Sequence, residues 1–167
     1  IICLEKHFCK QVDNVFYCKG CYRETNGERI EKIISEYLDD EFGTEYLLGS
    51  DQSLRSMGGC QLYRPDKLYT SQEITVMIEI DENQHRYYNC DLERSMEIYS
   101  ESPSESMRII RFNPDKYRGD ISIEHRKIYL LNLLKTIIND KAIGLTIYYM
   151  FYDIENIDDR YNYIMYP

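Results

Sequence analysis

The amino-acid sequence predicts an α/β fold in which helices flank a mixed central sheet. Three segments carry apolar residues at helical spacing, and short apolar runs typical of strands lie before and after them. The predicted order is helix, three strands, helix, strand and further additions. A helix between two strands indicates a crossover connection, and hence parallel strands within a mixed sheet.

Length and composition set the limits of this prediction. The chain has 167 residues, enough for one domain with a sizeable core. A hydrophobic content of 43% and a charged content of 29% are typical of globular proteins. The net charge of -9 argues against a large non-specific footprint on nucleic acid, because neutralising phosphates requires lysine and arginine. No apolar run approaches the length of a membrane span, so we expect no membrane partner.

The first helix is predicted to run from a capping box to Phe42. Thr25 stands three residues before Glu28, as a capping box requires, and Gly43 suits a helix end. Six apolar residues form one helical stripe. They are Ile30, Ile33, Ile34, Tyr37, Leu38 and Phe42.

Three strands are predicted to follow this helix. Tyr46–Leu48 is a short apolar run, and Gln61–Arg64 is a second strand that ends before Pro65. The strongest strand spans Ile74–Asp81 and alternates between two faces. One face carries Ile74, Val76, Ile78 and Ile80, and the other carries Thr75, Met77, Glu79 and Asp81.

The second half of the chain continues the same alternation of elements. Asp91–Glu101 is predicted to be a helix with Leu92, Met96 and Tyr99 facing inward. A strand over Met107–Phe112 then ends in a turn at Asn113-Pro114-Asp115. The remaining predicted elements are a helix over Glu124–Asn139, with Leu130, Leu131, Leu134, Ile137 and Ile138 as its core stripe, and a strand over Leu145–Tyr152.

Acidic residues gather where two of these strands meet. Asp66 follows Pro65, and Glu79 and Asp81 share one strand face, about 7 Å apart at the backbone. Phosphodiester hydrolysis needs a metal that polarises the phosphoryl oxygen, and Mg²⁺ takes only one or two protein carboxylates. We predict that Asp66 and Glu79 bind Mg²⁺ or Mn²⁺, with Glu31 as a further ligand if the first helix packs over the sheet. The alternative is a set of solvated acids at strand ends.

These motifs together resemble the PD-(D/E)XK restriction-endonuclease-like superfamily. The resemblance rests on Arg64-Pro65-Asp66, on Ile78-Glu79-Ile80-Asp81-Glu82-Asn83-Gln84-His85, on Glu93-Arg94 and on Ile110-Arg111-Phe112-Asn113-Pro114-Asp115. Similar motifs occur in uncharacterised members from large DNA viruses and some protists, and in the very-short-patch-repair endonucleases. The resemblance covers about residues 28–117 and implies a restriction-endonuclease-like core, DNA as the substrate, and an intracellular location in the host cell of a large DNA virus.

The chain departs from the superfamily at one position, since Asp81 stands where the usual lysine falls. The very-short-patch group departs there too, which implies that His85 handles a proton, and an imidazole titrates in a suitable range. Gln84 would orient water, Asp81 would support the metal or the water, and Lys67 would be a displaced lysine. The alternative for His85 is a structural hydrogen bond.

Two arginines are candidates for contact with the scissile phosphate. Arg94 lies on the second predicted helix and Arg111 on the following strand. Guanidinium groups bind phosphate in bidentate geometry. Ion pairs with neighbouring acids are the alternative for both arginines.

The N-terminal residues 1–25 form a separate cysteine-rich element, ahead of the domain over 26–153 and a tail over 154–167. Cys18 and Cys21 have the tight spacing of a zinc knuckle, and Cys3 and Cys9 complete a four-thiolate site, with His7 as an alternative ligand. Structural zinc would fold a segment that has no core of its own. Reduced buried thiols are the alternative for these cysteines.

The sequence therefore predicts a metal-dependent DNA endonuclease with an N-terminal zinc element. One alternative is a catalytically inactive nuclease-fold protein that binds DNA or serves as a structural component, for example of a virion. The missing lysine and the acidic charge favour that alternative. Another is a zinc-organised interaction module that uses the tyrosine-rich tail. Cutting of both strands by this fold implies a homodimer, for which the sequence shows no interface.

Overall fold

The structure is a computed structural model, and it describes residues 10–12, 15–17, 29–52, 63–71, 73–82, 88–102, 104–153 and 163–166. Its elements are β1 (Lys10–Val12), β2 (Val15–Tyr17), α2 (Ile30–Glu41), β3 (Leu47–Gly49), β4 (Lys67–Thr70), β5 (Thr75–Ile80), α3 (Tyr88–Glu101), β6 (Ser106–Phe112), α4 (Ile123–Ile137), β7 (Gly144–Met150) and β8 (Tyr163–Tyr166). None of the described helices is both long and apolar enough to cross a membrane.

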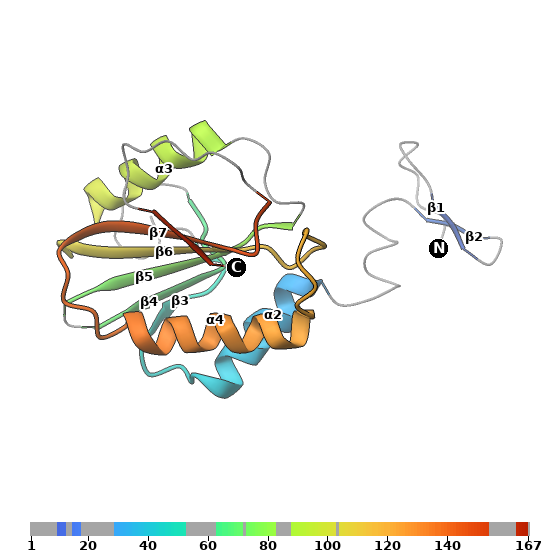
Figure 1. Cartoon of the computed structure of the whole chain (residues 1–167), viewed down its shortest axis with the longest axis horizontal. Helices are drawn as coiled ribbons and strands as arrows, with labels where there is room; N and C mark the ends of the chain where they lie inside the picture. The colour runs from blue at the N-terminus through green and yellow to red at the C-terminus, as the bar shows by residue number, and fades with distance from the viewer. Residues whose placement is uncertain are drawn as a thin grey trace.

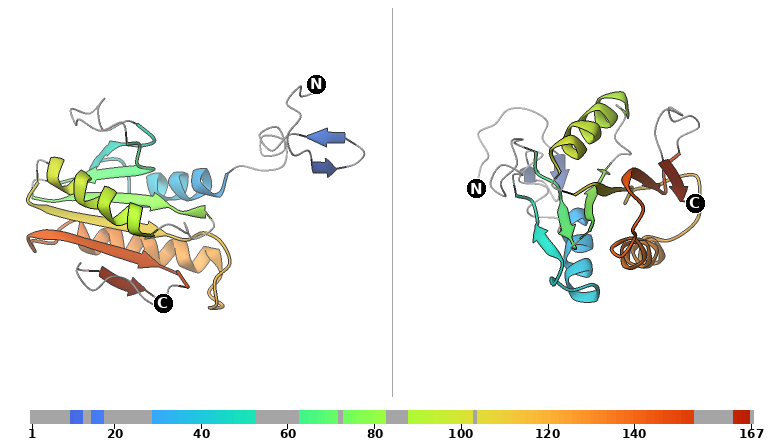
Figure 2. Two further views of the ribbon diagram at one scale, coloured as in Figure 1. Left: turned by 90° about the horizontal axis from the view of Figure 1, so that it is seen from above. Right: turned by 90° about the vertical axis from the view of Figure 1, so that its left-hand side faces the viewer.

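A mixed six-stranded sheet organises the described residues, in the order β3-β4-β5-β6-β7-β8. Neighbours from β3 to β5 are antiparallel, whereas neighbours from β5 to β8 are parallel. Helix α3 covers one face of the sheet, and α2 and α4 cover the other (Figures 1 and 2). The predicted α/β class is confirmed. Strand β8 was not predicted, because the tail shows no alternation from which an edge strand could be recognised.

The face under α2 and α4 holds the larger apolar core. Every residue of the predicted α4 stripe is buried there, and from α2 the core takes Ile34 and Leu38. The prediction for Ile33 was wrong, since its side chain is 40% exposed. Helix α2 packs through the row spaced four residues apart, which turns Ile33 to the margin of the stripe.

The face under α3 holds a second core that includes Met77 and Ile109. Tyr99 packs against this core as predicted, but Met96 is 38% exposed, so its predicted inward orientation was wrong. Ser95 and Ile98 are buried instead. Met96 lies about 100° around the helix from Ser95, which turns it away from the sheet.

Strand β5 has the alternation that the sequence predicts. Val76, Ile78 and Ile80 pack in the core under α2 and α4, and Met77 packs under α3. The following residue of the same parity, Glu79, therefore faces α3. This alternation fixes the side of the sheet on which the acidic residues gather.

The second predicted strand was placed too early. Arg64 belongs to no strand, Gln61 and Leu62 lie outside the described residues, and β4 begins only at Lys67. The Asp66 carboxylate accepts the backbone N–H of Ile80 at 2.6 Å, so a side chain satisfies that donor where β4 begins. The ladder starts with the next pair, Lys67 and Ile78.

Strands β1 and β2 form a separate antiparallel pair that joins Lys10 to Tyr17 and Val12 to Val15. The predicted zinc ligands Cys3, His7, Cys9, Cys18 and Cys21 lie outside the described residues, as does the capping box over 25–28. The described α2 begins after Arg29, whose side chain makes no capping hydrogen bond.

Candidate active site

Asp66 and Glu79 meet on the α3 face, where β4 begins and β5 ends. The antiparallel register that pairs Lys67 with Ile78 leads directly to Asp66 opposite Glu79. Leu68 and Met77, the next residues of the same parity, both pack under α3. The two carboxyl groups therefore lie side by side on one face, as the sequence predicts.

Both carboxyl groups are held in an environment that disfavours their ionised forms. Burial raises the pKa of Asp66 to about 7, and the charges of Glu31, Asp81 and Asp51 add to this rise, while the Ile80 N–H opposes it. Burial, then the charge of Asp66, raises the pKa of Glu79 to about 8. Glu79 Oε1 is buried and has no hydrogen-bond partner. The positive charge of Arg111 opposes the rise in the pKa of Glu79 only in part.

Asp81 belongs to a buried network. Its Oδ2 accepts from Arg111 Nε at 2.6 Å and from the Tyr152 hydroxyl at 2.5 Å, and its Oδ1 accepts from Arg111 Nη2 at 3.0 Å. Asp81 is 5% exposed and Arg111 is 6% exposed. Asp81 thus holds an arginine from the neighbouring strand.

Tyr63 and Arg94 complete the described surroundings of Glu79. The Tyr63 hydroxyl hydrogen-bonds the Glu79 side chain, and burial followed by the charge of Glu79 raises the Tyr63 pKa well above its usual range. The guanidinium carbon of Arg94, from α3, lies 3.7 Å from the centre of the Tyr63 ring. Sequence reasoning missed Tyr63 and Tyr152, because both reach the acids through contacts that leave no local pattern.

The other predicted residues differ in where they lie. Lys67 faces away from the site, where its Nζ contacts Asp39 of α2 at 2.6 and 2.7 Å, so the prediction of a displaced lysine was wrong. Glu31 acts on Asp66 through its charge. Among the residues that the structure describes, no three His, Cys, Asp or Glu side chains are grouped to hold a metal ion. Gln84 and His85 lie outside the described residues.

The Asn113-Pro114-Asp115 segment forms the predicted turn and anchors the neighbouring strand end. Asn113 Oδ1 accepts the Asp115 N–H at 2.9 Å, and its Nδ2 donates to the Phe151 carbonyl at 2.7 Å. Arg126 donates to the carbonyls of all three turn residues. By fixing Phe151, Asn113 also fixes the backbone that carries Tyr152 towards Asp81.

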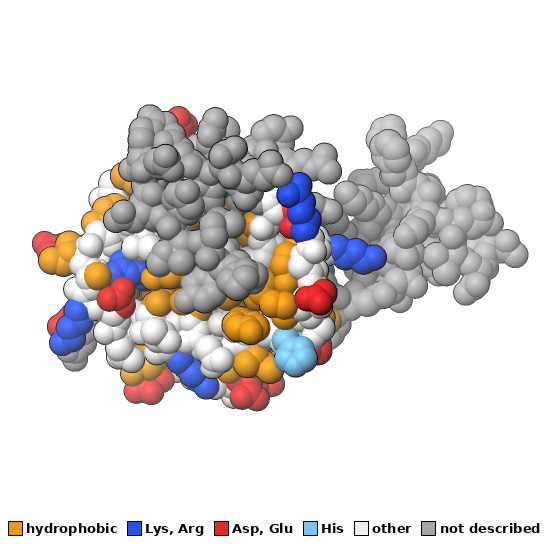
Figure 3. Space-filling model, viewed as in Figure 1, with side chains coloured by type: hydrophobic (Ala, Val, Ile, Leu, Met, Phe, Trp, Pro, Cys, Tyr) orange, Lys and Arg blue, Asp and Glu red, His pale blue; other side chains and the backbone are white. Residues whose placement is uncertain are grey.

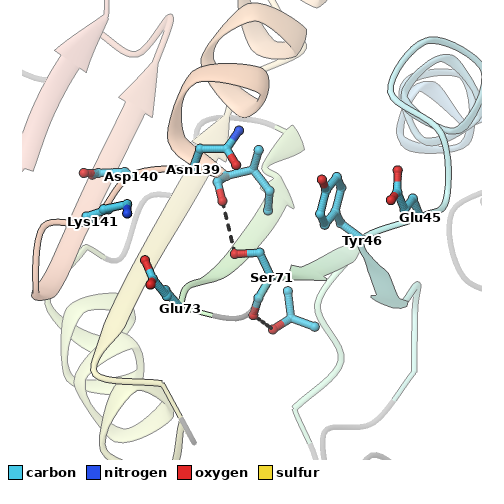
Figure 4. Close-up of a pocket in the computed structure, with 9 residues that line it drawn as sticks. Glu45, Tyr46, Ser71, Glu73, Asn139, Asp140 and Lys141 are labelled. Atoms are coloured by element: carbon cyan, nitrogen blue, oxygen red, sulfur yellow. Dashed lines mark hydrogen bonds between the residues drawn. The ribbon is translucent and has the colours of Figure 1, made fainter.

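A hollow of about 670 Å³ lies at the opposite end of the sheet, between the β4–β5 turn and the end of α4. The Ser71 hydroxyl donates to the Ile138 carbonyl across it at 3.2 Å (Figure 4). Of the acids that line it, Asp140 is already bound by the buried Arg108. This hollow contains none of the predicted site residues.

Comparison with family models, with curated proteins and with solved structures finds no significant match to this chain. The interpretation of the site therefore rests on the chemistry of its own residues.

Proposed function

We propose that this protein is a metal-dependent DNA endonuclease with a restriction-endonuclease-like core and an active site at Asp66 and Glu79. The observation that carries the proposal is the pair of partly buried carboxyl groups at facing strand positions, one of which has a buried oxygen without a hydrogen-bond partner. Burying such charges is unfavourable unless a cation or donor compensates them. A site that holds this arrangement in its folded state is suited to a divalent cation.

The residues present fit magnesium or manganese. Magnesium retains several waters and needs only one or two protein carboxylates, so Asp66 and Glu79 suffice without Glu31. When bound, the ion polarises a phosphoryl oxygen and lowers the pKa of a water molecule. Gln84 and His85 remain the candidates for orienting water and for handling a proton.

Arg111 is the group that would supply the positive charge expected from the missing lysine. It lies opposite Glu79 in the register of β5 and β6, and its charge opposes the rise in the Glu79 pKa. Asp81 and Tyr152 hold its guanidinium group in place. In this proposal Asp81 positions an arginine and is not itself a metal ligand.

DNA as the substrate comes from the motif resemblance, and the surface suits a small footprint. On the face in Figure 3, acidic and basic side chains are interspersed with hydrophobic ones around the described elements. With a net charge of -9, affinity would depend on a few placed arginines and on the metal.

The test is cleavage of supercoiled plasmid and of mismatched duplex in Mg²⁺, in Mn²⁺ and in EDTA. We expect metal-dependent nicking by the wild type and none by Asp66→Asn or Glu79→Gln. Glu73→Gln is the matched control, because Glu73 is an exposed acid at the opposite end of the sheet. Undiminished cleavage by both site variants would reject the proposed site.

The buried Asp81–Arg111 pair also favours a second candidate, a nuclease-fold protein that binds DNA without cutting it. In that case Arg111 serves only to stabilise the strand ends. Absence of cleavage on every substrate, together with intact folding and DNA binding that survives Glu79→Gln, would select this candidate.

We also propose structural zinc at Cys3, Cys9, Cys18 and Cys21, with His7 as the alternative ligand. The β1–β2 register supports it, because Cys9 precedes Lys10 and Cys18 follows Tyr17, the two residues paired at one end of the ladder. Elemental analysis of the purified protein tests this directly. A zinc content that is unchanged in Cys18→Ser would contradict it.

A further inference from the structure

We propose that Tyr63 is a positioning residue that joins the two halves of this site, its hydroxyl holding Glu79 and its ring holding Arg94. The inference rests on the proposed function, since it assigns how one metal ligand and one phosphate ligand are kept in place. Tyr63 immediately precedes the Arg64-Pro65-Asp66 motif, so the same short segment carries Asp66 and the residue that orients Glu79.

The Tyr63 hydroxyl orients Glu79, which is a proposed metal ligand. Tyr63 hydrogen-bonds the Glu79 carboxyl group, whose Oε1 has no hydrogen-bond partner. A carboxyl group that is fixed by one donor and keeps an oxygen without a hydrogen-bond partner is oriented for a cation before the cation arrives. Preorganised ligands bind more tightly because less conformational entropy is lost on binding.

The Tyr63 ring positions Arg94, which is a proposed phosphate ligand. Arg94 is an exposed residue on α3, yet its guanidinium carbon lies only 3.7 Å from the Tyr63 ring centre. A guanidinium group stacked face-on over an aromatic ring keeps its N–H donors directed outward along its edge. The ring is itself held from below, because Tyr63 packs against the core under α3. Stacking thus places Arg94 for a phosphate beside the metal ligands.

The two functions of Tyr63 can be separated by substitution. Tyr63→Phe removes the hydroxyl and keeps the ring, whereas Tyr63→Leu removes both. The first readout is affinity for Mn²⁺ alone, measured by titration calorimetry. The second is affinity for a short fluorescent duplex in EDTA, measured by anisotropy. Neither readout requires turnover.

We expect Tyr63→Phe to weaken Mn²⁺ binding about 3–10-fold, as loss of a typical hydrogen bond would, and to leave DNA affinity unchanged. Tyr63→Leu should weaken Mn²⁺ binding to the same extent and also reduce DNA affinity about 3-fold, the loss expected for one cation–π contact. Arg94→Ala should reduce DNA affinity in the wild type and in Tyr63→Phe, but add little in Tyr63→Leu.

Tyr99→Phe is the matched control. Tyr99 packs against the same core, but its hydroxyl donates to the Glu105 carbonyl at 3.1 Å, away from the site. Both affinities should equal those of the wild type in this variant. Thermal unfolding of every variant identifies any loss of fold, and Tyr63→Phe decides the proposal if Tyr63→Leu does not fold.

The results separate this inference from the proposed function. Wild-type Mn²⁺ affinity in Tyr63→Phe, with binding lost in Glu79→Gln, would overturn the link and leave the metal site standing. An equal effect of Arg94→Ala in the wild type and in Tyr63→Leu would also overturn it. Mn²⁺ binding that is unchanged in Glu79→Gln would overturn both proposals.

Discussion

Two sites on opposite faces of the sheet treat charge in opposite ways. On the face under α2 and α4, buried Arg108 donates to Asp140 and to carbonyls of Met107 and Gly144, all at 2.8–2.9 Å. On the α3 face, Asp66 and Glu79 lie together, and Glu79 Oε1 has no partner. The first arrangement stabilises the fold, whereas the second leaves a demand that a cation would meet. This contrast is the reason that we propose the functional site on the α3 face.

The largest expected effect comes from breaking the hydrogen-bond network of Arg108 on the face under α2 and α4. Arg108→Met should lower the free energy of unfolding by about 3 kcal/mol, because it leaves Asp140 and several carbonyls without their donor. Urea denaturation monitored by circular dichroism measures this. A change below about 1 kcal/mol would mean that the network contributes little and would weaken the contrast.

Removing a charged side chain at Glu79, on the α3 face, should change the free energy of unfolding in the opposite direction. At pH 8, Glu79→Gln is expected to raise the free energy of unfolding by about 2 kcal/mol, because it removes a partly buried, desolvated charge next to Asp66. The folded-state pKa of about 8 lies above the ordinary value of 4.5. Protonation therefore stabilises the wild type at acid pH, and this contribution is lost as the pH rises towards 8.

Urea denaturation across this pH range checks the sign. The advantage of Glu79→Gln over the wild type should be large at pH 8 and small near pH 5, where the wild-type carboxyl is already protonated. Glu73→Gln, at an exposed position, should show no such trend. A variant that is less stable than the wild type at pH 8 would show that the ionised carboxyl is already compensated.

A divalent cation should stabilise the wild type at pH 8, as Glu79→Gln does, because it compensates the same charge. Mn²⁺ at ten times its dissociation constant should stabilise the wild type at pH 8 by about 1.4 kcal/mol and leave Glu79→Gln unchanged. This corresponds to a rise of roughly 3–5 °C in Tm, measured by scanning calorimetry. Equal stabilisation of both proteins would place the cation elsewhere, for instance in the N-terminal element.

The sequence predicted the three helices, the central strand β5 and the proximity of Asp66 to Glu79, because alternation in β5 and the position of Pro65 are local features, but it did not predict β1, β2 or β8. It placed β4 too early, because the bond between the Asp66 carboxylate and the Ile80 N–H is non-local. Composition and spacing alone also could not show that Arg111 pairs with Asp81, since this contact depends on the register of β5 and β6.

The two tyrosines of the site were unpredictable for the same reason. Tyr152 reaches Asp81 across 71 positions of sequence, and no period or motif connects them. Tyr63 lies in the segment that was predicted to be a strand, Gln61–Arg64, and nothing in that segment marks it as a neighbour of Glu79. With seventeen tyrosines in the chain, residue type gave no guide to which two contact the acids.

The smallest expected effect tests whether the network of Asp81, Arg111 and Tyr152 only stabilises the fold or also serves the proposed activity. Tyr152→Phe removes one hydrogen bond to Asp81 and should lower stability by only about 1 kcal/mol, because the Arg111 bonds remain. If Asp81 and Tyr152 serve to aim Arg111, kcat for DNA cleavage should fall about 10-fold with little change in KM, since a misplaced charge affects the transition state most. Urea denaturation and steady-state kinetics on the same preparations separate the two roles, and an unchanged kcat would assign this network to the fold alone.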